Sequence, residues 1–595
     1  MFDATSRRAC AGLHGRASIF RFAVSCEENT NTHQPQLIVF VRNANAQQAP
    51  VMSTDYPDFG LDAAQRRDAV FTHRYEYPGM DGARGELWCY SDALAYAPGS
   101  LVRLMISSSV ERAELEIARD GAELRVVLQQ SLAGLRWQPT PEDCSVVGCG
   151  WESAFEFRIG EDWPSGAYRV SLVAAGNDGA PIRSHHLFIV KPRPGPKPRR
   201  VLQVAATGTW TAYNTWGGSN HYRGLTGPNR DQYSPTVSIE RPWCRGFVVL
   251  PADAPRVPLE CSPPPGAPLR YPHMEWAYAT GHSTKYASAG WASYDSHFMR
   301  WAERAGYAVD LVSQHELHYE PGLLHDYDCV VMVGHDEYWS WEMRDAIDAY
   351  VDRGGHVARF AGNFMWQTRL EEGGRRQVCY KYRARAEDPV YRERDNSRTT
   401  GSWEAPETGR PGAATFGLNA IDGLYAGWGG CAARGVRGFP VYRPGHWAFR
   451  GTDLSYGDLL GAEGHAFGYE VDGLPYVIRD GLPEALPTGG APEGLSILAL
   501  GMSSLIEEPR SQADIDDRFI GDEEATYVAG LRFGDASAAS VDRVKRGCGM
   551  IVHFTRGAGE VFHAGSCEWV AALLRNDAMV ARVTSNVLDR YLAGS

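Results

Sequence analysis

The chain has 595 residues, 44% hydrophobic, 22% charged and 11% aromatic, a composition typical of a globular protein with several domains. Its 72 acidic and 59 basic residues give a net charge of −13, and no long Lys/Arg run is present, which argues against nucleic acid as a partner. Twelve cysteines without a C-x-x-C pair argue against a disulfide framework, so we expect reduced thiols.

The N-terminal segment, residues 1–51, has scattered Arg, little periodicity and no apolar signal-peptide core. We therefore predict a disordered extension there. No apolar run in the chain approaches the roughly 18 residues that a membrane span needs, and the longest early candidate is 37–41. This pattern predicts a cytoplasmic protein with no membrane partner.

Residues 52–190 are expected to form a β-sandwich. Apolar and polar residues alternate between about 75 and 190, for example at 101–106 and 168–172, and turn signals such as Asp120-Gly121 separate the runs. This pattern is typical of an Ig-like β-sandwich. Residues 191–198 follow with alternating prolines, which favour an extended chain and predict a linker.

Beyond the linker, the period of the apolar residues changes to that of alternating strands and helices. Buried strands are predicted at 201–205, 307–312, 329–333, 357–361, 550–554 and 560–562, and helices at 296–305, 341–351 and 583–592. Ser340 is a plausible N-cap of the second helix. The strand–helix–strand spacing predicts right-handed βαβ units in a parallel sheet.

The predicted fold class is therefore α/β. An N-terminal β-sandwich precedes a larger, mostly parallel α/β domain of the flavodoxin or amidotransferase-like kind over 199–595. A long insertion of Gly-rich loops is expected within that domain at about 376–491.

Polar residues that follow predicted strands are candidates for chemistry, because ligands of open parallel sheets bind beyond the carboxyl ends of the strands. After one strand come His335, Asp336 and Glu337, and alternation lets His335 and Glu337 converge while Asp336 turns away. An imidazole and a carboxylate can serve as metal ligand and general base. Alternatively, Glu337 caps the following helix and His335 binds backbone.

Four further residues are candidates. Tyr213 offers a hard phenolate oxygen suited to ferric iron, although a packed ring is the more ordinary role of a loop tyrosine. Asn363 offers N–H donors for a developing oxyanion, or it turns the loop. Glu470 and Asp472 share a face if their stretch is extended, so one of them could be a base or both could be solvated. G-x-S-x-G, P-loop and H-E-x-x-H motifs are missing.

Five motifs in order resemble the large (beta) subunit of N,N-dimethylformamidase, over about residues 200–595. They are T-W-x-A-Y-N-x-W-G-G at 209–218, G-H-D-E-Y-W at 334–339, G-N-x-x-W at 362–366, C-Y-K at 379–381 and V-F-x-A-G-S with a following Trp at 561–569. The resemblance implies amide hydrolysis of a small-molecule substrate at a mononuclear iron (Fe³⁺), held by two tyrosines and one glutamate. It also implies a small second subunit, or a homo-oligomer, as partner.

Carried over position by position, Glu337 resembles the carboxylate ligand and Tyr213 the first tyrosine ligand. His335, Asn363 and Glu470 resemble positions that either act in catalysis or support the metal ligands.

The second tyrosine ligand of the family is expected just before Arg241-Pro242. This chain has Thr-Val-Ser at 236–238 instead, so the resemblance leaves Tyr233, or alternatively Tyr222, as the second ligand.

Two other functions stay open. One is a non-catalytic carbohydrate- or protein-binding protein with a degenerate α/β domain, in which the 17 Trp supply stacking surfaces. The other is a metal-free amidotransferase-like hydrolase with a Cys nucleophile. For the amidase, we expect the indoles of Trp210, Trp216, Trp339 and Trp366 to make the pocket narrow and apolar, which favours small N-alkylated amides.

Overall fold

The computed structural model describes residues 58–72, 74–79, 84–224, 233–256, 271–423, 437–504 and 522–593. The extension predicted at 1–51 lies outside these residues. Within the described part, no helix is both long and apolar enough to cross a membrane.

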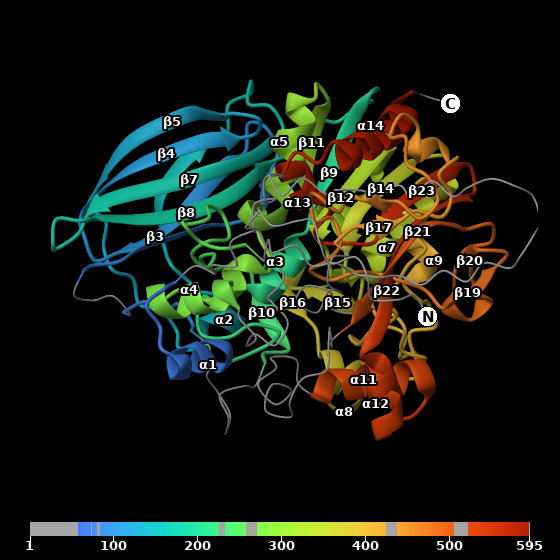
Figure 1. Ribbon diagram of the computed structural model, residues 1–595. Coiled ribbons are helices and arrows are strands. Elements are labelled where there is room, and N and C mark those ends of the chain that lie inside the picture. The colour runs from blue at the N-terminus through green and yellow to red at the C-terminus, as the bar shows by residue number, and fades with distance from the viewer. Residues whose placement is uncertain are drawn as a thin grey trace, which may run out of the picture. The chain divides into compact units, whose positions relative to one another are not determined.

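Two sheets are built from residues 87–190 (Figure 1). One has the order β1-β3-β6 and the other β2-β8-β7-β4-β5. Their strands are β1 (Leu87–Ser91), β2 (Ala95–Tyr96), β3 (Leu101–Ser108), β4 (Arg112–Asp120), β5 (Leu124–Ala133), β6 (Ser153–Arg158), β7 (Gly166–Ala175) and β8 (Pro181–Val190). Alternate side chains of both sheets, such as Leu104, Ile117 and Tyr168, share one buried core. The strands expected from alternation are present, whereas a separate Ig-like domain over 52–190 stays a prediction.

A seven-stranded sheet with the order β11-β9-β12-β14-β23-β22-β21 forms the centre of the α/β part. Its strands are β9 (Arg200–Ala205), β11 (Ala308–Ser313), β12 (Cys329–His335), β14 (His356–Gly362), β21 (Ser496–Ser504), β22 (Arg546–Arg556) and β23 (Gly559–Ala564). The first five strands in this order are parallel. The α/β class is therefore confirmed, while the likeness to flavodoxin or amidotransferase folds stays a prediction.

The C-terminal strands differ from the predicted repetition of parallel βαβ units. β22 pairs antiparallel with β23, and β21, which the sequence pattern did not predict, pairs antiparallel with β22. Only two residues separate β22 from β23, and Gly557 has a φ of 56° there. So short a connection can join only antiparallel neighbours.

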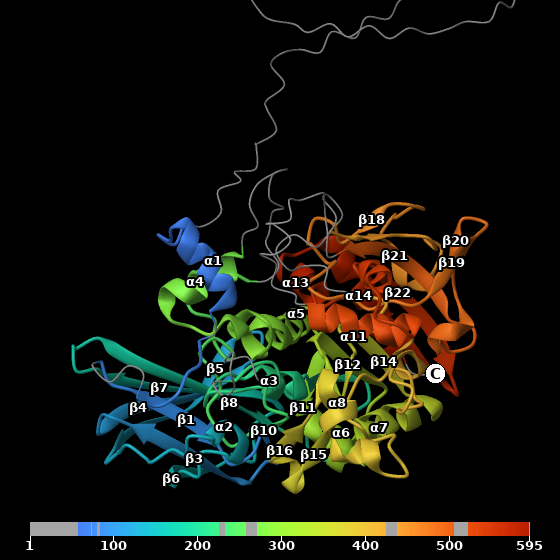
Figure 2. The same cartoon turned by 90° about the horizontal axis from the view of Figure 1, so that it is seen from below.

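Helices cover both faces of this sheet, as Figure 2 shows, with α5 (Ser296–Arg304), α13 (Trp569–Leu574) and α14 (Ala578–Leu592) on one side and α6 (Gln314–Tyr319) and α7 (Trp341–Asp352) on the other. Alternation along β12 explains this arrangement. Val331 packs in the core that contains α5, α13 and α14, whereas Val330 and Met332 pack in the core of α7. A strand that is buried on both faces has a continuous run of apolar residues in its sequence, which is why β12 was predictable.

The strand order places β9 between β11 and β12, so the chain extends from β9 in both directions. Such a switch point opens a crevice beyond the carboxyl ends of the strands, where ligands bind. The helix α3 (Thr207–Tyr213) follows β9 directly, β12 ends at His335 and β14 ends at Gly362. The candidate residues of the sequence therefore gather at this end of the sheet.

Smaller elements surround the sheet. A second sheet has the order β10-β16-β15-β13, from β10 (Thr236–Ser238), β13 (Tyr338–Ser340), β15 (Trp366–Glu371) and β16 (Arg376–Val378). The remaining α-helices and strands of the described residues are α1 (Ala63–Phe71), α2 (Cys144–Val147), α4 (Pro272–Thr280), α8 (Ala384–Glu387), α9 (Ala413–Phe416), α11 (Asp522–Phe533), α12 (Ala538–Val544), β17 (Phe439–Pro440), β18 (Leu459–Leu460), β19 (Tyr476–Arg479) and β20 (Leu482–Ala485). The described part of the predicted insertion at 376–491 thus holds only short elements.

Candidate active site

Glu337 is held by its backbone just beyond the end of β12. Its N–H donates to Thr209 Oγ1 at 2.8 Å, and its carbonyl accepts from the Trp366 N–H at 3.0 Å. Gly334 turns the chain here with a φ of 71°, and a Cβ at that position would lie 2.4 Å from Tyr294 Cβ. Only glycine therefore allows this exit from the strand.

His335 faces two carboxylates. Its Nδ1 donates to the carbonyl of Ser288 at 2.6 Å, which fixes the ring so that Nε2 points into the site. Nε2 lies 2.8 Å from Glu470 and 3.3 Å from Glu337. The backbone contact of His335 is therefore present, and its second ring nitrogen meets two carboxylates, whereas its role in chemistry stays a prediction. Glu337, in contrast, does not cap α7, whose N-cap is Ser340.

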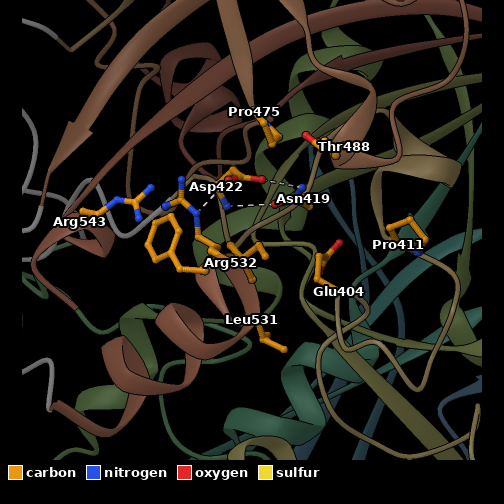
Figure 3. Close-up of a pocket in the computed structure, with 12 residues that line it drawn as sticks. Glu404, Pro411, Asn419, Asp422, Pro475, Thr488, Leu531, Arg532 and Arg543 are labelled. Atoms are coloured by element: carbon orange, nitrogen blue, oxygen red, sulfur yellow. Dashed lines mark hydrogen bonds and ion pairs between the residues drawn. The ribbon is translucent and has the colours of Figure 1, made fainter. Parts of the chain in front are cut away.

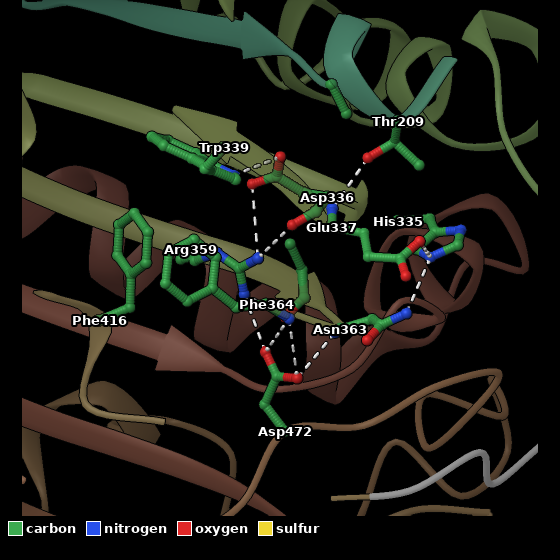
Figure 4. A network of polar contacts seen from close by, with 12 residues as sticks. Thr209, His335, Asp336, Glu337, Trp339, Arg359, Asn363, Phe364, Phe416 and Asp472 are labelled. Carbon is green, nitrogen blue, oxygen red and sulfur yellow. Dashed lines mark hydrogen bonds and ion pairs between the residues drawn. The ribbon is translucent and has the colours of Figure 1, made fainter. Parts of the chain in front are cut away.

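Asn363 completes this group (Figure 4). Its Nδ2 donates to Glu470 at 2.7 Å and lies 3.3 Å from His335 Nε2. Its φ of 63° shows that it also turns the loop after β14. The Asn363 N–H donates to Asp472 at 2.7 Å, so Glu470 and Asp472 both face this residue, as their alternate positions indicated.

Tyr222, rather than Tyr233, meets Glu337. The Tyr222 hydroxyl lies 2.7 and 2.8 Å from the two carboxylate oxygens of Glu337. The Tyr213 ring is 4.5 Å from the Tyr222 ring and 5.0 Å from the His335 ring.

Tyr233 donates instead to the carbonyl of Tyr380 at 2.8 Å. The cause is the pairing of β10 with β16, in which Thr236 lies opposite Val378, because this register brings Tyr233 beside Tyr380.

Two buried lysines lie over the tyrosine rings. Lys381 Nζ is 3.1 Å from the centre of the Tyr222 ring, and Lys285 Nζ is 4.4 Å from it and 4.8 Å from that of Tyr213. Burial lowers the pKa of Lys285 to about 7 and that of Lys381 to about 8. No sequence pattern pointed to Lys285, and Lys381 was noted only as the last residue of the C-Y-K motif.

The charges of the site depend on burial and on the close carboxylates. Burial lowers the pKa of His335, but Glu470 and Glu337 outweigh this effect and raise it to about 10. Burial raises the pKa of Glu337, yet His335, Lys381 and Tyr222 leave it below its usual range. Burial and the charge of Glu337 raise the pKa of both Tyr213 and Tyr222. Without a bound cation, the phenols therefore stay protonated beside an ionised carboxylate.

The donor set fits a hard cation. Two phenol oxygens and one carboxylate are the oxygen donors that suit ferric iron. The Tyr222 hydroxyl donates its proton to Glu337. A cation held by these two side chains would have to displace that proton. A second group, His335, Glu470 and Cys567, has its donor atoms within 4.8 Å of one another.

Cys567 is the cysteine closest to this chemistry among the described ones, all of which are buried. Burial and the nearby Glu470 raise the pKa of its thiol well above the usual value. A thiolate is the nucleophilic form of cysteine, so this environment disfavours a cysteine nucleophile at the site.

The tryptophans differ from the predicted arrangement. Trp366 donates its indole N–H to Glu337 and thus borders the site. Trp339, in contrast, packs against Phe364 and Phe416 in the core and donates to Asp336. Trp210 donates to Asp295, and Trp216 packs between Trp88 and Trp151. The expected four-indole wall is therefore wrong, and tyrosine rings take its place around His335.

A buried ion network centred on Arg359 lies beside the site (Figure 4). Arg359 on β14 donates to Asp472 at 3.1 Å and to the carbonyl of Asp336 at 2.8 Å. The Asp336 carboxylate also accepts from Gln314 at 2.9 Å. Asp336 therefore turns away from Glu337, as alternation predicted, and Arg359 joins the ends of β12 and β14 to the loop that carries Glu470.

We expect Arg359→Met to lower the free energy of unfolding by about 3–5 kcal/mol, because it leaves two buried carboxylates without their cation. Urea unfolding followed by tryptophan fluorescence measures this change. Arg125→Met is the matched control, since Arg125 is exposed, and it should change the free energy by less than about 0.5 kcal/mol. Equal effects of the two substitutions would contradict the supporting role of Arg359.

The sequence matches the family described as N,N-dimethylformamidase beta subunit-like, C-terminal, over residues 116–580. Two curated relatives are the N,N-dimethylformamidase beta subunits of Alcaligenes sp, 25% identical over 324 residues, and of Paracoccus aminophilus, 26% identical over 325 residues. Each match covers 50% of this chain and 36% of the relative, so the chain spans about a third of the length of these relatives.

Among solved structures, the sporulation control protein Spo0M from Bacillus subtilis matches 18% of this chain and 50% of its own. At 12% identity and a TM-score of 0.14, this similarity has no bearing on the fold or on the site.

Proposed function

Because the chain belongs to the N,N-dimethylformamidase beta subunit-like family, we propose that it hydrolyses small carboxamides, with N-alkylated formamides as the preferred class. The observation that carries this proposal is the convergence of four buried side chains beyond β12 and β14. These side chains contact one another in turn: Glu337 lies 3.3 Å from His335, His335 lies 2.8 Å from Glu470, and Glu470 lies 2.7 Å from Asn363.

We propose that Tyr213, Tyr222 and Glu337 hold one ferric ion. The hydrogen bond from Tyr222 to Glu337 and the 4.5 Å spacing of the two tyrosine rings support this ligand set. When bound, such an ion supplies Lewis acidity that polarises an amide carbonyl and makes water a better nucleophile.

His335 is proposed to move the proton. Glu470 would accept a proton from the attacking water, and the His335 imidazolium, which the two carboxylates stabilise, would donate one from Nε2 to the leaving amine. The bond from Nδ1 to Ser288 keeps the ring in place during both transfers. A proton passed from Glu470 to Nε2, 2.8 Å away, then restores the imidazolium.

Asn363 is proposed to hold the carbonyl oxygen. One N–H of its Nδ2 group is used by Glu470, which leaves the second N–H to donate to a substrate oxygen. Such a donor acts mainly as negative charge develops in the transition state. The buried tyrosine rings around His335 exclude water and disfavour charged substrates.

A further subunit is part of the proposal. The two curated relatives are named beta subunits, which supports assembly of this chain with a second subunit or with itself.

The choice of tyrosine provides the test. With iron supplied, the wild-type protein should hydrolyse N,N-dimethylformamide and show a visible phenolate-to-iron band. Tyr222→Phe should weaken the band and lower iron content, because its hydroxyl contacts Glu337. Tyr233→Phe, the matched control, removes only a hydrogen bond to Tyr380 and should change neither.

The reverse result for the two variants would reject the ligand set. Absence of hydrolysis by the iron-loaded protein across a broad panel of small amides would reject the substrate class.

A further inference from the structure

A cleft of about 460 Å³ lies between the C-terminal end of α11 and the loops that carry Asn419 and Thr488 (Figure 3). Its volume is in the range of sites that bind small molecules. None of the residues assigned above to iron or to amide hydrolysis lines it. Its chemistry is therefore separate from that of the active site.

One end of the cleft is cationic. The guanidinium carbon of Arg543 lies 3.6 Å from the centre of the Phe533 ring, and that of Arg532 lies 5.2 Å from it. Stacking on a ring occupies the face of a guanidinium and leaves its N–H donors at the edge. Among the described residues, Arg543 has no carboxylate within ion-pair distance.

Arg532 has a donor to spare. Its Nε pairs with Asp422 at 3.0 Å, and the other oxygen of Asp422 accepts from Asn419 at 3.1 Å. Arg532 Nη1 is buried and has no hydrogen-bond partner within the described part of the chain. The Arg532 side chain is 19% exposed and lines the cleft, so part of it is open to an anionic ligand.

The rest of the cleft is mostly apolar, and the carboxylate of Glu404 already has hydrogen-bond donors. Glu404, drawn on the side opposite the arginines in Figure 3, already accepts from the Gly412 N–H at 2.8 Å and from the Ser402 hydroxyl at 3.1 Å. Burial raises the pKa of Glu404 to about 7, which weakens its repulsion of an anion. The apolar walls come from Pro411, Ile421, Pro475 and Leu531.

We propose that this cleft binds a small organic carboxylate, with its anionic group on Arg532 and Arg543 and its apolar body against the proline and aliphatic walls. A singly charged ligand fits because Asp422 already offsets one of the two guanidinium charges. An inorganic anion would leave the apolar walls without a partner. A planar carboxylate also matches the donor edge of a guanidinium.

The position of the cleft on α11 connects it with the active site. Tyr527, on the preceding turns of the same helix, lies 5.8 Å from the Trp366 ring and accepts from the Ser402 N–H at 3.0 Å. A ligand bound at Arg532 therefore stabilises a helix that packs on the tryptophan beside Glu337.

Isothermal titration with benzoate, on the full chain, tests the proposal. Wild-type protein should bind benzoate, and Arg543→Gln should bind it about 10-fold or more weakly, since one charge-assisted pair is lost. Arg546→Gln is the matched control, because Arg546 pairs with Asp542 and does not line the cleft. Benzamide, with the same shape and no charge, should bind far more weakly than benzoate.

Benzoate binding that is absent in the wild type, unchanged in Arg543→Gln or matched by benzamide would overturn the proposal. Equally tight binding of inorganic phosphate would show a general anion site and also overturn it.

Arg543→Lys keeps the charge and separates loss of binding from loss of folding, because it should bind benzoate more tightly than Arg543→Gln. Arg543 takes no part in amide hydrolysis, so the basal rate of its variants should equal that of the wild type, and either proposal can fail alone.

Discussion

Glu337→Gln is expected to remove bound iron and amide hydrolysis together, with a fall in rate of at least about 10³-fold, because a Lewis acid contributes several kcal/mol to such a reaction. The substitution keeps the volume of the side chain but replaces its charged oxygen by an amide. Glu337 is buried, accepts from Tyr222 and Trp366, and feels the charge of Lys381, so its carboxylate is the only charged oxygen group at this position. Iron content, the visible band and the hydrolysis rate are the three measurements.

Glu560→Gln is the control for this experiment, since Glu560 pairs with Arg590 and His553 outside the site. It should keep both iron and rate. Full hydrolysis by iron-free wild-type protein, or by Glu337→Gln, would contradict the assigned role of Glu337.

Variants of the proton-transfer and oxyanion groups are expected to separate binding of iron from chemistry. His335→Ala and Glu470→Gln should keep iron and lose about 10²–10⁴-fold in rate, as removal of a positioned acid or base does. Loss of the Asn363 amide should cost about 10²–10³-fold, the effect of one oxyanion donor. The measurement is the rate at saturating amide, with iron content determined on the same sample.

The Asn363 variant has to respect the backbone. Because Asn363 has a φ of 63°, alanine there would add strain that is unrelated to catalysis. Asn363→Gly removes the donor without that strain, and Asn363→Asp keeps the shape but replaces the donor by an acceptor. Both should lose rate and retain iron. Wild-type rates in all of these variants would leave only a binding role for the site.

Local structure at the site was largely predictable from the sequence. The continuous apolar run of β12 indicated a strand buried on both faces, and Ser340 marked the start of α7. Alternation beyond the strand placed His335 and Glu337 together and turned Asp336 away, as the contacts of the three side chains show. Such features depend on neighbours within a few residues, which is why one sequence was enough to predict them.

Other features depended on contacts between distant segments, which no local pattern encodes. Tyr222 meets Glu337, and Tyr233 does not, because β10 pairs with β16 in one register. Lys285 joined the site without any sequence signal of its own. Two other features likewise depend on distant contacts. β21 pairs antiparallel with β22, and Trp339 is buried against Phe416 in the core.

The sequence by itself thus determined the family, the α/β class and the set of side chains available at the ends of the strands. Tertiary structure decided which of these side chains touch. It determined that Tyr222 faces Glu337 and that Lys381 lies over the Tyr222 ring. It also brought the carbonyl of Ser288, 47 positions away in the chain, to the ring nitrogen of His335 that it orients. The physical reason is that strand register and core packing depend on the whole chain, whereas propensity and alternation depend on a few neighbouring residues.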